Sequence, residues 1–293
     1  MRRILVTGAR GQLGSQLLRC AEDKGLQAAG VGSAELDITD RDAVDRWVEP
    51  DAVVINCAAY TAVDGAESDE AAARAVNEIG ARNLAAACSR AGAGLIQVST
   101  DYVFAGDRAG DAAVPYEADD PTGPRSVYGR TKLAGERAVH AELPSAQIVR
   151  TAWVYTGTAG GSSGAGADFV ATMLRLERER DTVRVVDDQM GAPTYSVDLA
   201  AGLLELACTG GRGVTTLHAT NAGSATRFDL ARAVFAEVGA DPERVQPCSS
   251  AEFAKPAPRP AYSVLSPRSW EAAGLTPLRP WWEALADALA RLG

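Results

Sequence analysis

The chain has 293 residues, 46% hydrophobic and 23% charged, proportions that suit a globular protein with one large α/β domain and a smaller lobe. Its formal net charge of -9 excludes the broad basic surface that nucleic-acid binding requires. No apolar run is long enough to span a membrane, and because a strand is predicted as early as Arg3 to Thr7 we expect no signal peptide. The five cysteines form no C-x-x-C pair, so we expect reduced thiols and a cytoplasmic location.

A glycine-rich turn separates this first strand from the first predicted helix. The turn reads G-x-x-G-x-x-G and consists of Gly8, Ala9, Arg10, Gly11, Gln12, Leu13 and Gly14. Glycines at these positions permit a tight turn, close approach of a pyrophosphate to the backbone, and packing of the helix on the strand. We therefore predict a dinucleotide-binding turn. A glycine-rich turn without a ligand is the alternative.

The residues after the second predicted strand bear on which dinucleotide binds. NAD-specific folds usually carry an acid at the end of this strand, where it holds the ribose 2′-hydroxyl. Val31 to Ala34, after the strand predicted at Leu26 to Val31, contains no acid. Arg10 can instead meet a 2′-phosphate through a charge-assisted contact. The sequence thus favours NADPH, with NADH tolerated.

Two more apolar runs predict buried parallel strands, at Asp51 to Asn56 and Leu95 to Phe104. Open parallel sheets bind ligands beyond the carboxyl ends of their strands. Thr100 and Asp101 lie at such an end, so we expect them to take part in chemistry. Capping of the chain that follows is the alternative role.

A predicted helix that reaches about Ala141 carries Tyr128 and Lys132 four residues apart, and therefore on one face. The ammonium would favour the phenolate and lower the pKa of the tyrosine, so that the phenol could exchange a proton near neutral pH. The chain has 7 Tyr and only three Lys, and an Arg could not replace this lysine because it does not deprotonate. A chance pair on a solvated helix is the alternative.

Strand and helix patterns alternate through the first half of the chain, which predicts an α/β fold with a Rossmann-type doubly wound parallel sheet. We predict a dinucleotide-binding domain at 1–152, to which 196–220 returns, and a smaller C-terminal substrate-binding lobe over most of 153–293. The glycine-rich stretch 156–167 lacks the lysine of a P-loop and is expected to line the entrance to the site.

Phrases spread over nearly the whole chain carry a resemblance to a known family. They are Gly8 to Gly14, Asn56 to Asp64, Ser99 to Phe104, Tyr128 to Lys132, Arg150 to Tyr155, Asp187 to Thr194 and Arg259 to Leu265. Together they resemble the dTDP-4-dehydrorhamnose reductase family of the extended short-chain dehydrogenase/reductase superfamily. The resemblance implies reduction of the C4 ketone of dTDP-4-dehydro-L-rhamnose to dTDP-L-rhamnose, with hydride from NAD(P)H.

The resemblance also implies roles for individual residues. Tyr128 would donate the proton, Lys132 would hold the nicotinamide ribose and tune the phenol, and Thr100 would orient the ketone. Asp101 and Trp153 would face the sugar nucleotide. The residues lining the cofactor would be Gln12 and Leu13 with the rest of the glycine turn, Asp37, Ile38, Ala58, Ala59, Tyr60, Tyr128 and Lys132.

Metal binding is not expected. Neither histidine belongs to a cluster with metal-ligand spacing. Members of the resembled family that bind Mg²⁺ between subunits use a glutamate two residues past the glycine turn. Gln16, a neutral and poorer ligand, stands there in this chain.

Two other functions stay open. One is a 4-ketoreductase for a different dTDP-deoxysugar of secondary metabolism. The other is a non-catalytic NADP-binding regulatory homologue, like relatives associated with methionine adenosyltransferase, and the intact Thr100, Tyr128 and Lys132 set speaks against it. We expect a dTDP-4-keto-6-deoxysugar as the small-molecule partner, neither nucleic acid nor membrane, and leave a homodimer open.

Overall fold

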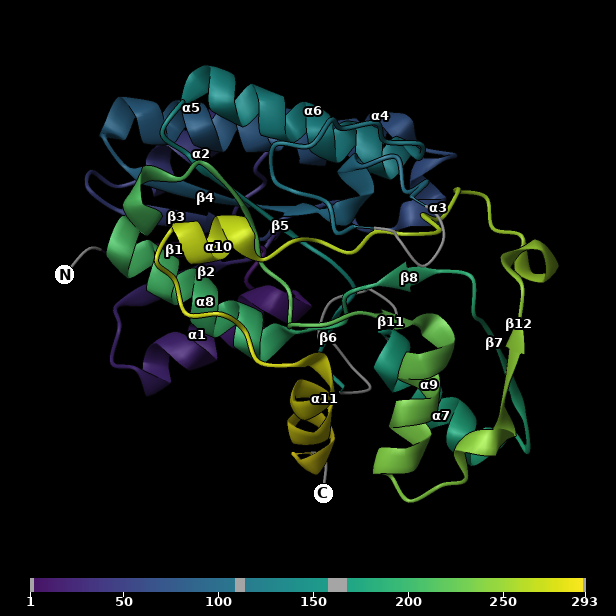
Figure 1. Cartoon of the computed structure of the whole chain (residues 1–293). Helices are drawn as coiled ribbons and strands as arrows, with labels where there is room; N and C mark the ends of the chain where they lie inside the picture. The colour runs from purple at the N-terminus through teal and green to yellow at the C-terminus, as the bar shows by residue number, and fades with distance from the viewer. Residues whose placement is uncertain (1–2, 109–113, 158–167, 292–293) are drawn as a thin grey trace.

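The computed structural model describes residues 3–108, 114–157 and 168–291. At its centre lies a six-stranded sheet with the order β10-β5-β4-β3-β1-β2, in which all neighbours are parallel (Figure 1). The Rossmann-type α/β prediction is therefore confirmed. The strands are β1 (Ile4–Thr7), β2 (Ala28–Val31), β3 (Val53–Asn56), β4 (Gly94–Thr100), β5 (Gln147–Thr151) and β10 (Thr216–His218).

Helices cover both faces of this sheet (Figure 1). The alternation of side chains along β3 shows why, since Val53 and Ile55 enter one hydrophobic cluster and Val54 enters the other. The first cluster is covered by α1 (Gln12–Asp23), α8 (Ser196–Thr209) and α10 (Arg268–Ala272). The second is covered by α2 (Arg41–Trp47), α5 (Ala81–Ala91) and α6 (Val127–Glu142).

The strand order changes direction at β1, which bonds to β2 on one side and to β3 on the other. Open α/β sheets bind ligands outside the carboxyl ends of their strands at such a point. Gly8 follows β1 with a φ of 65°, and a Cβ there would lie 2.6 Å from the backbone nitrogen of Ala58, which follows β3. Only glycine fits this position, and the two loops consequently touch.

A π-helical turn, η1 (Ala75–Gly80), interrupts the helix before α5. It places Asn77 between the loop after β3 and helix α6. The Asn77 carboxamide accepts from Tyr60 N (2.9 Å) and donates to Thr131 Oγ1 (3.1 Å). Turns of this kind recur at functional sites. Before it come α3 (Val63–Ala66) and α4 (Glu70–Arg74).

A smaller lobe lies beside the sheet and has its own core, in which Val170, Leu230, Phe235 and Leu285 are buried. Its strands pair as β6 with β9, β7 with β12 and β8 with β11. The helices and strands of this lobe are β6 (Val154–Tyr155), α7 (Phe169–Glu179), β7 (Val183–Val186), β8 (Met190–Gly191), β9 (Thr194–Tyr195), β11 (Ala225–Thr226), α9 (Arg227–Glu237), β12 (Val245–Cys248) and α11 (Trp281–Ala290). The short helical turns of the chain are η2 (Asp101–Val103), η3 (Gly210–Gly213), η4 (Pro242–Arg244) and η5 (Ser250–Phe253).

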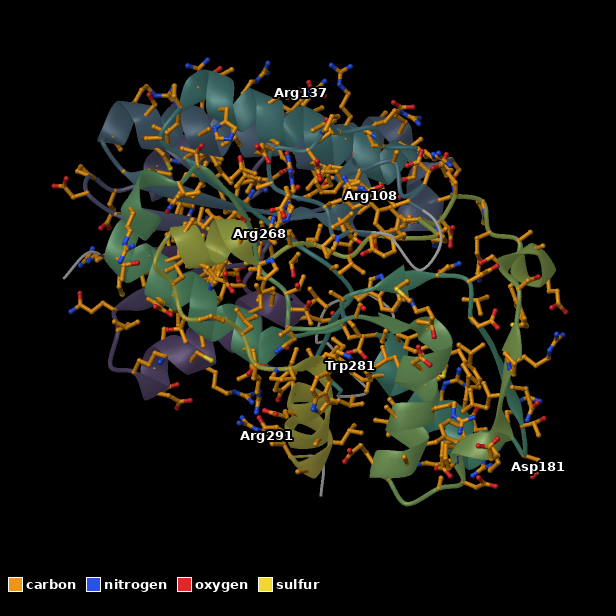
Figure 2. All side chains as sticks on the ribbon, in the orientation of Figure 1. Arg108, Arg137, Asp181, Arg268, Trp281 and Arg291 are labelled. Atoms are coloured by element: carbon orange, nitrogen blue, oxygen red, sulfur yellow. The ribbon has the colours of Figure 1, made fainter. Side chains whose placement is uncertain are left out.

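The segment 196–220 comprises α8, η3 and β10, and β10 forms one edge of the central sheet. Most of the glycine-rich stretch 156–167 lies outside the described residues. No helix within the described ranges has the length and apolar character needed to cross a membrane. Charged side chains such as Arg137 and Asp181 project outward from the ribbon (Figure 2).

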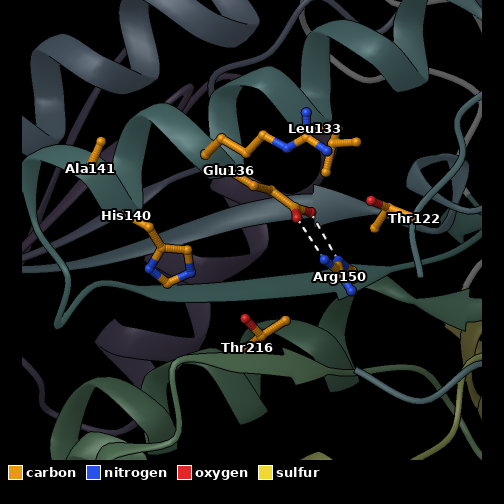
Figure 3. A pocket seen from close by; sticks show the side chains of 8 residues that line it. Thr122, Leu133, Glu136, His140, Ala141, Arg150 and Thr216 are labelled. Atoms are coloured by element: carbon orange, nitrogen blue, oxygen red, sulfur yellow. Dashed lines mark hydrogen bonds and ion pairs between the residues drawn. The ribbon is translucent and has the colours of Figure 1, made fainter. Parts of the chain in front are cut away.

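Helix α6 and strand β5 share a buried ion pair (Figure 3). Arg150 donates from Nη2 and Nε to the two carboxylate oxygens of Glu136, at 2.7 and 3.0 Å, and the side chains are only 7% and 5% exposed. Arg150 also donates from Nη1 to the Ala118 carbonyl. Because removal of one partner leaves an uncompensated buried charge, this pair fixes α6 on the sheet.

We expect Glu136→Gln to lower the free energy of unfolding by about 3 kcal/mol, measured by urea denaturation, because Arg150 stays buried without its anion. The matched control is Glu49→Gln, which breaks the exposed pair with Arg3 and should cost less than about 1 kcal/mol. Equal losses in the two variants would contradict a role of the buried pair in docking α6.

Candidate active site

The residues singled out in the sequence gather at the carboxyl ends of neighbouring strands. The glycine turn follows β1, the segment 58–60 follows β3, and Thr100 ends β4. Tyr128 lies in the first turn of α6, whose N-cap Ser126 accepts from Gly129 N at 3.1 Å. Four elements therefore bring their functional side chains to one edge of the sheet.

The turn after β1 fits a dinucleotide pyrophosphate. Helix α1 begins at Gln12, and no side chain caps its N-terminus at Gly11. A Cβ on Gly14 would overlap the backbone oxygen of Gly8, so strand and helix pack at backbone distance. The uncapped N–H groups and the positive end of the helix dipole suit a phosphate anion.

The loop after β2 is fixed by polar contacts. Asp37 Oδ1 accepts from the backbone nitrogen and hydroxyl of Thr39, at 2.9 and 2.8 Å. Asn83 on α5 donates to the Ile38 and Thr39 carbonyls, at 3.1 and 3.0 Å. Asp37 is exposed and Ile38 is buried, and both occupy a defined turn next to the sheet edge.

Sequence reasoning missed an acid in this loop. Glu35 lies one residue beyond the stretch that we described as free of acids, and its carboxylate folds back to accept from Gly32 N at 3.0 Å. The same carboxylate pairs with Arg10. The end of β2 therefore carries the carboxylate of Glu35 as well as the guanidinium of Arg10. The argument that this loop favours NADPH because it lacks an acid was wrong.

Lys132 is held by a chain of buried hydrogen bonds. Its Nζ donates to the Val98 carbonyl at 2.8 Å, and this carbonyl also accepts from Gln97 Nε2 at 2.9 Å. Gln97 Oε1 in turn accepts from Asn56 Nδ2 at 2.7 Å, which links β4 to β3. Burial lowers the pKa of Lys132 to about 8, opposed by the nearby Glu136 carboxylate. The ammonium is thereby fixed in place at the end of the sheet.

Tyr128 lies edge-on to Tyr102, with ring centroids 5.6 Å apart. Burial raises the pKa of Tyr128 and the Asp101 charge adds to this rise, whereas a hydrogen bond with the Thr100 hydroxyl opposes it. The prediction that Lys132 lowers this pKa was wrong. The lysine ammonium bonds to the backbone of β4, and burial is the largest influence on the phenol.

Asp101 offers a buried carboxylate beside the phenol. It is 2% exposed, and its Oδ1 accepts from Thr100 Oγ1 at 3.0 Å. Its Oδ2 is not hydrogen-bonded to any described residue. Burial raises the pKa of Asp101 to about 6, against the influence of Ser263, Thr100 and Arg227. The group is therefore mostly ionised at neutral pH, and its second oxygen is buried without a hydrogen-bond partner among the described residues.

Trp153 lies between the two lobes in a strained conformation. Its φ of 47° is rare for a bulky residue, and such strain clusters at functional sites. The guanidinium carbon of Arg227 lies 3.6 Å from the centroid of its ring. A Cβ on Gly191 would overlap the indole from β8. Arg227 and Gly191 of the smaller lobe thus fix the orientation of the Trp153 indole ring.

Charges of both signs surround Tyr102. Burial raises the pKa of Tyr102 to about 12 and the Asp101 and Asp64 carboxylates add to the rise, whereas the charges of Arg259 and Arg227 oppose it. Arg259 is anchored by Asp64 at 2.8 Å, whereas burial lowers the pKa of Arg227 to about 10. Two guanidinium groups therefore lie close to the candidate catalytic residues.

A family model described as the RmlD substrate binding domain matches residues 1–293. The chain belongs to this family. A dTDP-4-dehydrorhamnose reductase of Mycobacterium tuberculosis (strain ATCC 25618 / H37Rv) is 57% identical over 288 residues, which are 98% of this chain and 92% of that protein. The family resemblance found in the sequence is thereby confirmed.

Two further comparisons concern the sugar and the cofactor. A Streptomyces antibioticus protein, named probable dTDP-4,6-dihydroxy-2-methyloxan-3-one 4-ketoreductase, is 47% identical over 98% of this chain and 94% of its own length. A crystal structure of dTDP-4-dehydrorhamnose reductase from Bacillus anthracis str. Ames, in complex with NADP, matches with a TM-score of 0.89. Its identity is 36%, over 99% of this chain and 100% of that one.

The site of this RmlD family member contains residues that had no clear signal in the sequence. Arg227 follows a capping threonine at the start of α9 and looks like one of many surface arginines.

A separate cavity of about 530 Å³, lined in part by Arg137, His140 and Thr216 beside α6, includes no residue of the site (Figure 3). Among the described residues, no group of three potential ligands is arranged for a metal ion.

We expect the Tyr128 phenol of this family member to stay protonated below about pH 9, because burial raises its pKa. The measurement is an ultraviolet titration of tyrosinate absorbance in the protein and in Tyr128→Phe. The two curves should coincide up to that pH. A tyrosinate signal near neutral pH that disappears in Tyr128→Phe would show instead that the pKa is lowered.

Proposed function

We propose that this chain is a reductase that uses NADPH to convert dTDP-4-dehydro-L-rhamnose into dTDP-L-rhamnose. The observation that carries the proposal is the placement of Tyr128, Thr100 and Lys132 beside a glycine turn that fits a dinucleotide. Family membership and the names of the relatives support the sugar nucleotide. The NADP in the Bacillus anthracis structure supports the cofactor.

Tyr128 acts in this proposal as the proton donor. The bound nicotinamide supplies hydride to C4 of the sugar. Tyr128 gives its phenolic proton to the ketone oxygen, so that an O–H bond forms as the C=O double bond becomes single and the residue becomes a phenolate. The Thr100 hydroxyl, which donates to Asp101 Oδ1 at 3.0 Å in the structure, turns its single hydrogen to the phenolate as it forms. A proton from solvent then restores the phenol.

Lys132 supplies a fixed positive charge. With a pKa of about 8 it is mostly charged at neutral pH. An ammonium has three N–H donors, and one is used by the Val98 carbonyl. The others are available to the ribose of the cofactor.

The substrate is held, in this proposal, by groups from both lobes. Asp101 Oδ2 accepts from a sugar hydroxyl, and the indole of Trp153 forms a flat wall with Arg227 behind it. Arg227 and Arg259 provide positive charge for the diphosphate, which guanidinium groups bind well. This arrangement suits a nucleotide sugar better than a small uncharged ketone.

A second candidate is the reduction of another dTDP-4-keto-6-deoxysugar. The 47% identity to the Streptomyces antibioticus 4-ketoreductase favours it. The groups described above recognise a ketone, a hydroxyl and a diphosphate, which both substrates share. Product stereochemistry separates the two candidates, and turnover on epimeric 4-keto sugars measures it.

The proposal includes a cytoplasmic location and no nucleic-acid partner. All five cysteines lie in the described ranges and are free thiols, as suits a reducing compartment. The net charge of -9 would repel nucleic acid, whereas local arginines can still hold one diphosphate.

We expect Tyr128→Phe to lower kcat for the 4-keto sugar by about 10²- to 10⁴-fold, because the proton donor is lost. The NADPH dissociation constant should change little. Turnover is followed by NADPH oxidation, and binding by the fluorescence of the nicotinamide.

The matched control is Tyr116→Phe, which removes the same oxygen from a buried tyrosine that stacks on Phe104. It should keep wild-type turnover. Wild-type turnover in Tyr128→Phe would refute the proton-donor assignment. No NADPH oxidation by the unmodified protein with either 4-keto sugar would refute the proposed function.

A further inference from the structure

Two loops meet at the carboxyl ends of β1 and β2. The strands pair in register up to Thr7 and Val31, so the loops start side by side. Ala9 N donates to the Val31 carbonyl at 3.1 Å and ties them together. A Cβ on Gly32 would lie 3.0 Å from Cδ and Nε of Arg10. The side chain of Arg10 therefore crosses the end of β2.

Glu35 closes the second of these loops. Its backbone nitrogen donates to the Gly32 carbonyl at 3.1 Å, and its Oε2 accepts from Gly32 N at 3.0 Å. Its Oε1 pairs with Arg10. The loop thus returns a carboxylate to the end of β2, the position from which an acid binds ribose in NAD-specific folds.

The pair of Arg10 and Glu35 is open to exchange. The two side chains are 60% and 38% exposed. Exposed ion pairs contribute at most about 1 kcal/mol, so a ligand with a stronger charge can replace one partner. A 2′-phosphate would compete with the Glu35 carboxylate for the guanidinium. A 2′-hydroxyl would instead donate to the carboxylate.

We infer that Glu35 is a specificity-determining residue that balances NADPH against NADH through its ion pair with Arg10. NADPH binds by taking Arg10 from Glu35 and meets repulsion from the freed carboxylate. NADH leaves the pair intact and uses the carboxylate as an acceptor. The chain therefore accepts both cofactors, and its preference for NADPH is smaller than Arg10 alone would give. This inference rests on the proposed reductase function.

The test measures dissociation constants of NADPH and NADH by nicotinamide fluorescence, without substrate. Glu35→Gln keeps an acceptor for Gly32 N and removes the negative charge. It should tighten NADPH binding by about tenfold, because repulsion of the phosphate is lost, and weaken NADH by a few fold. Arg10→Ala should weaken NADPH by about tenfold and NADH far less. Competition by 2′,5′-ADP, which lacks the nicotinamide, should follow the NADPH pattern.

Glu49→Gln is the matched control, because it makes the same charge change in the exposed pair with Arg3 at the amino end of β1. Its two dissociation constants should equal those of the unmodified protein. An unchanged ratio of the two constants in Glu35→Gln would overturn the inference. The proposed function would survive that result if the unmodified protein still reduces the 4-keto sugar. If the ratio shifts in Glu35→Gln but the unmodified protein does not reduce the 4-keto sugar, the proposed function alone would be overturned.

Discussion

Close contact between helix α6 and its neighbours is the constraint on which the rest of the site depends. A Cβ on Gly129 would overlap the carbonyl of Tyr102, and one on Gly135 would overlap the carbonyl of Asn77 in the π-helical turn. A larger side chain at Gly129 would move the start of the helix away from η2, and one at Gly135 would move the helix away from the π-helical turn. Either shift would disturb the hydrogen bond of Lys132 to β4 at 2.8 Å. Two glycines thus fix the position of the helix that carries Tyr128 and Lys132.

This enclosed position also determines the charges of the two central groups. Burial favours the neutral form of a titratable side chain. It keeps the phenol of Tyr128 protonated and lowers the pKa of Lys132 to about 8. The site therefore holds a protonated phenol and a lysine that is mostly charged at neutral pH.

The fold and part of the site could be predicted from the sequence because their signals are local. The glycine turn, the apolar strands and the spacing of Tyr128 and Lys132 each lie within one or two elements. The return of Glu35 to the end of β2 depends on the backbone of a short loop, which composition does not reveal. The stacking of Arg227 on Trp153 joins residues far apart in the chain. The direction of the Tyr128 pKa shift depends on burial, and no spacing rule contains it.

The central claim is that this site delivers hydride to C4 of a dTDP-linked sugar. The most direct measurement uses NADPH carrying deuterium at C4 of the nicotinamide, in each stereospecific form, with the 4-keto sugar made enzymatically from dTDP-glucose. NMR of the product should show deuterium at C4 of the sugar from one of the two forms, with the configuration of dTDP-L-rhamnose. Oxidation of NADPH that leaves no deuterium at C4 from either form would contradict the account.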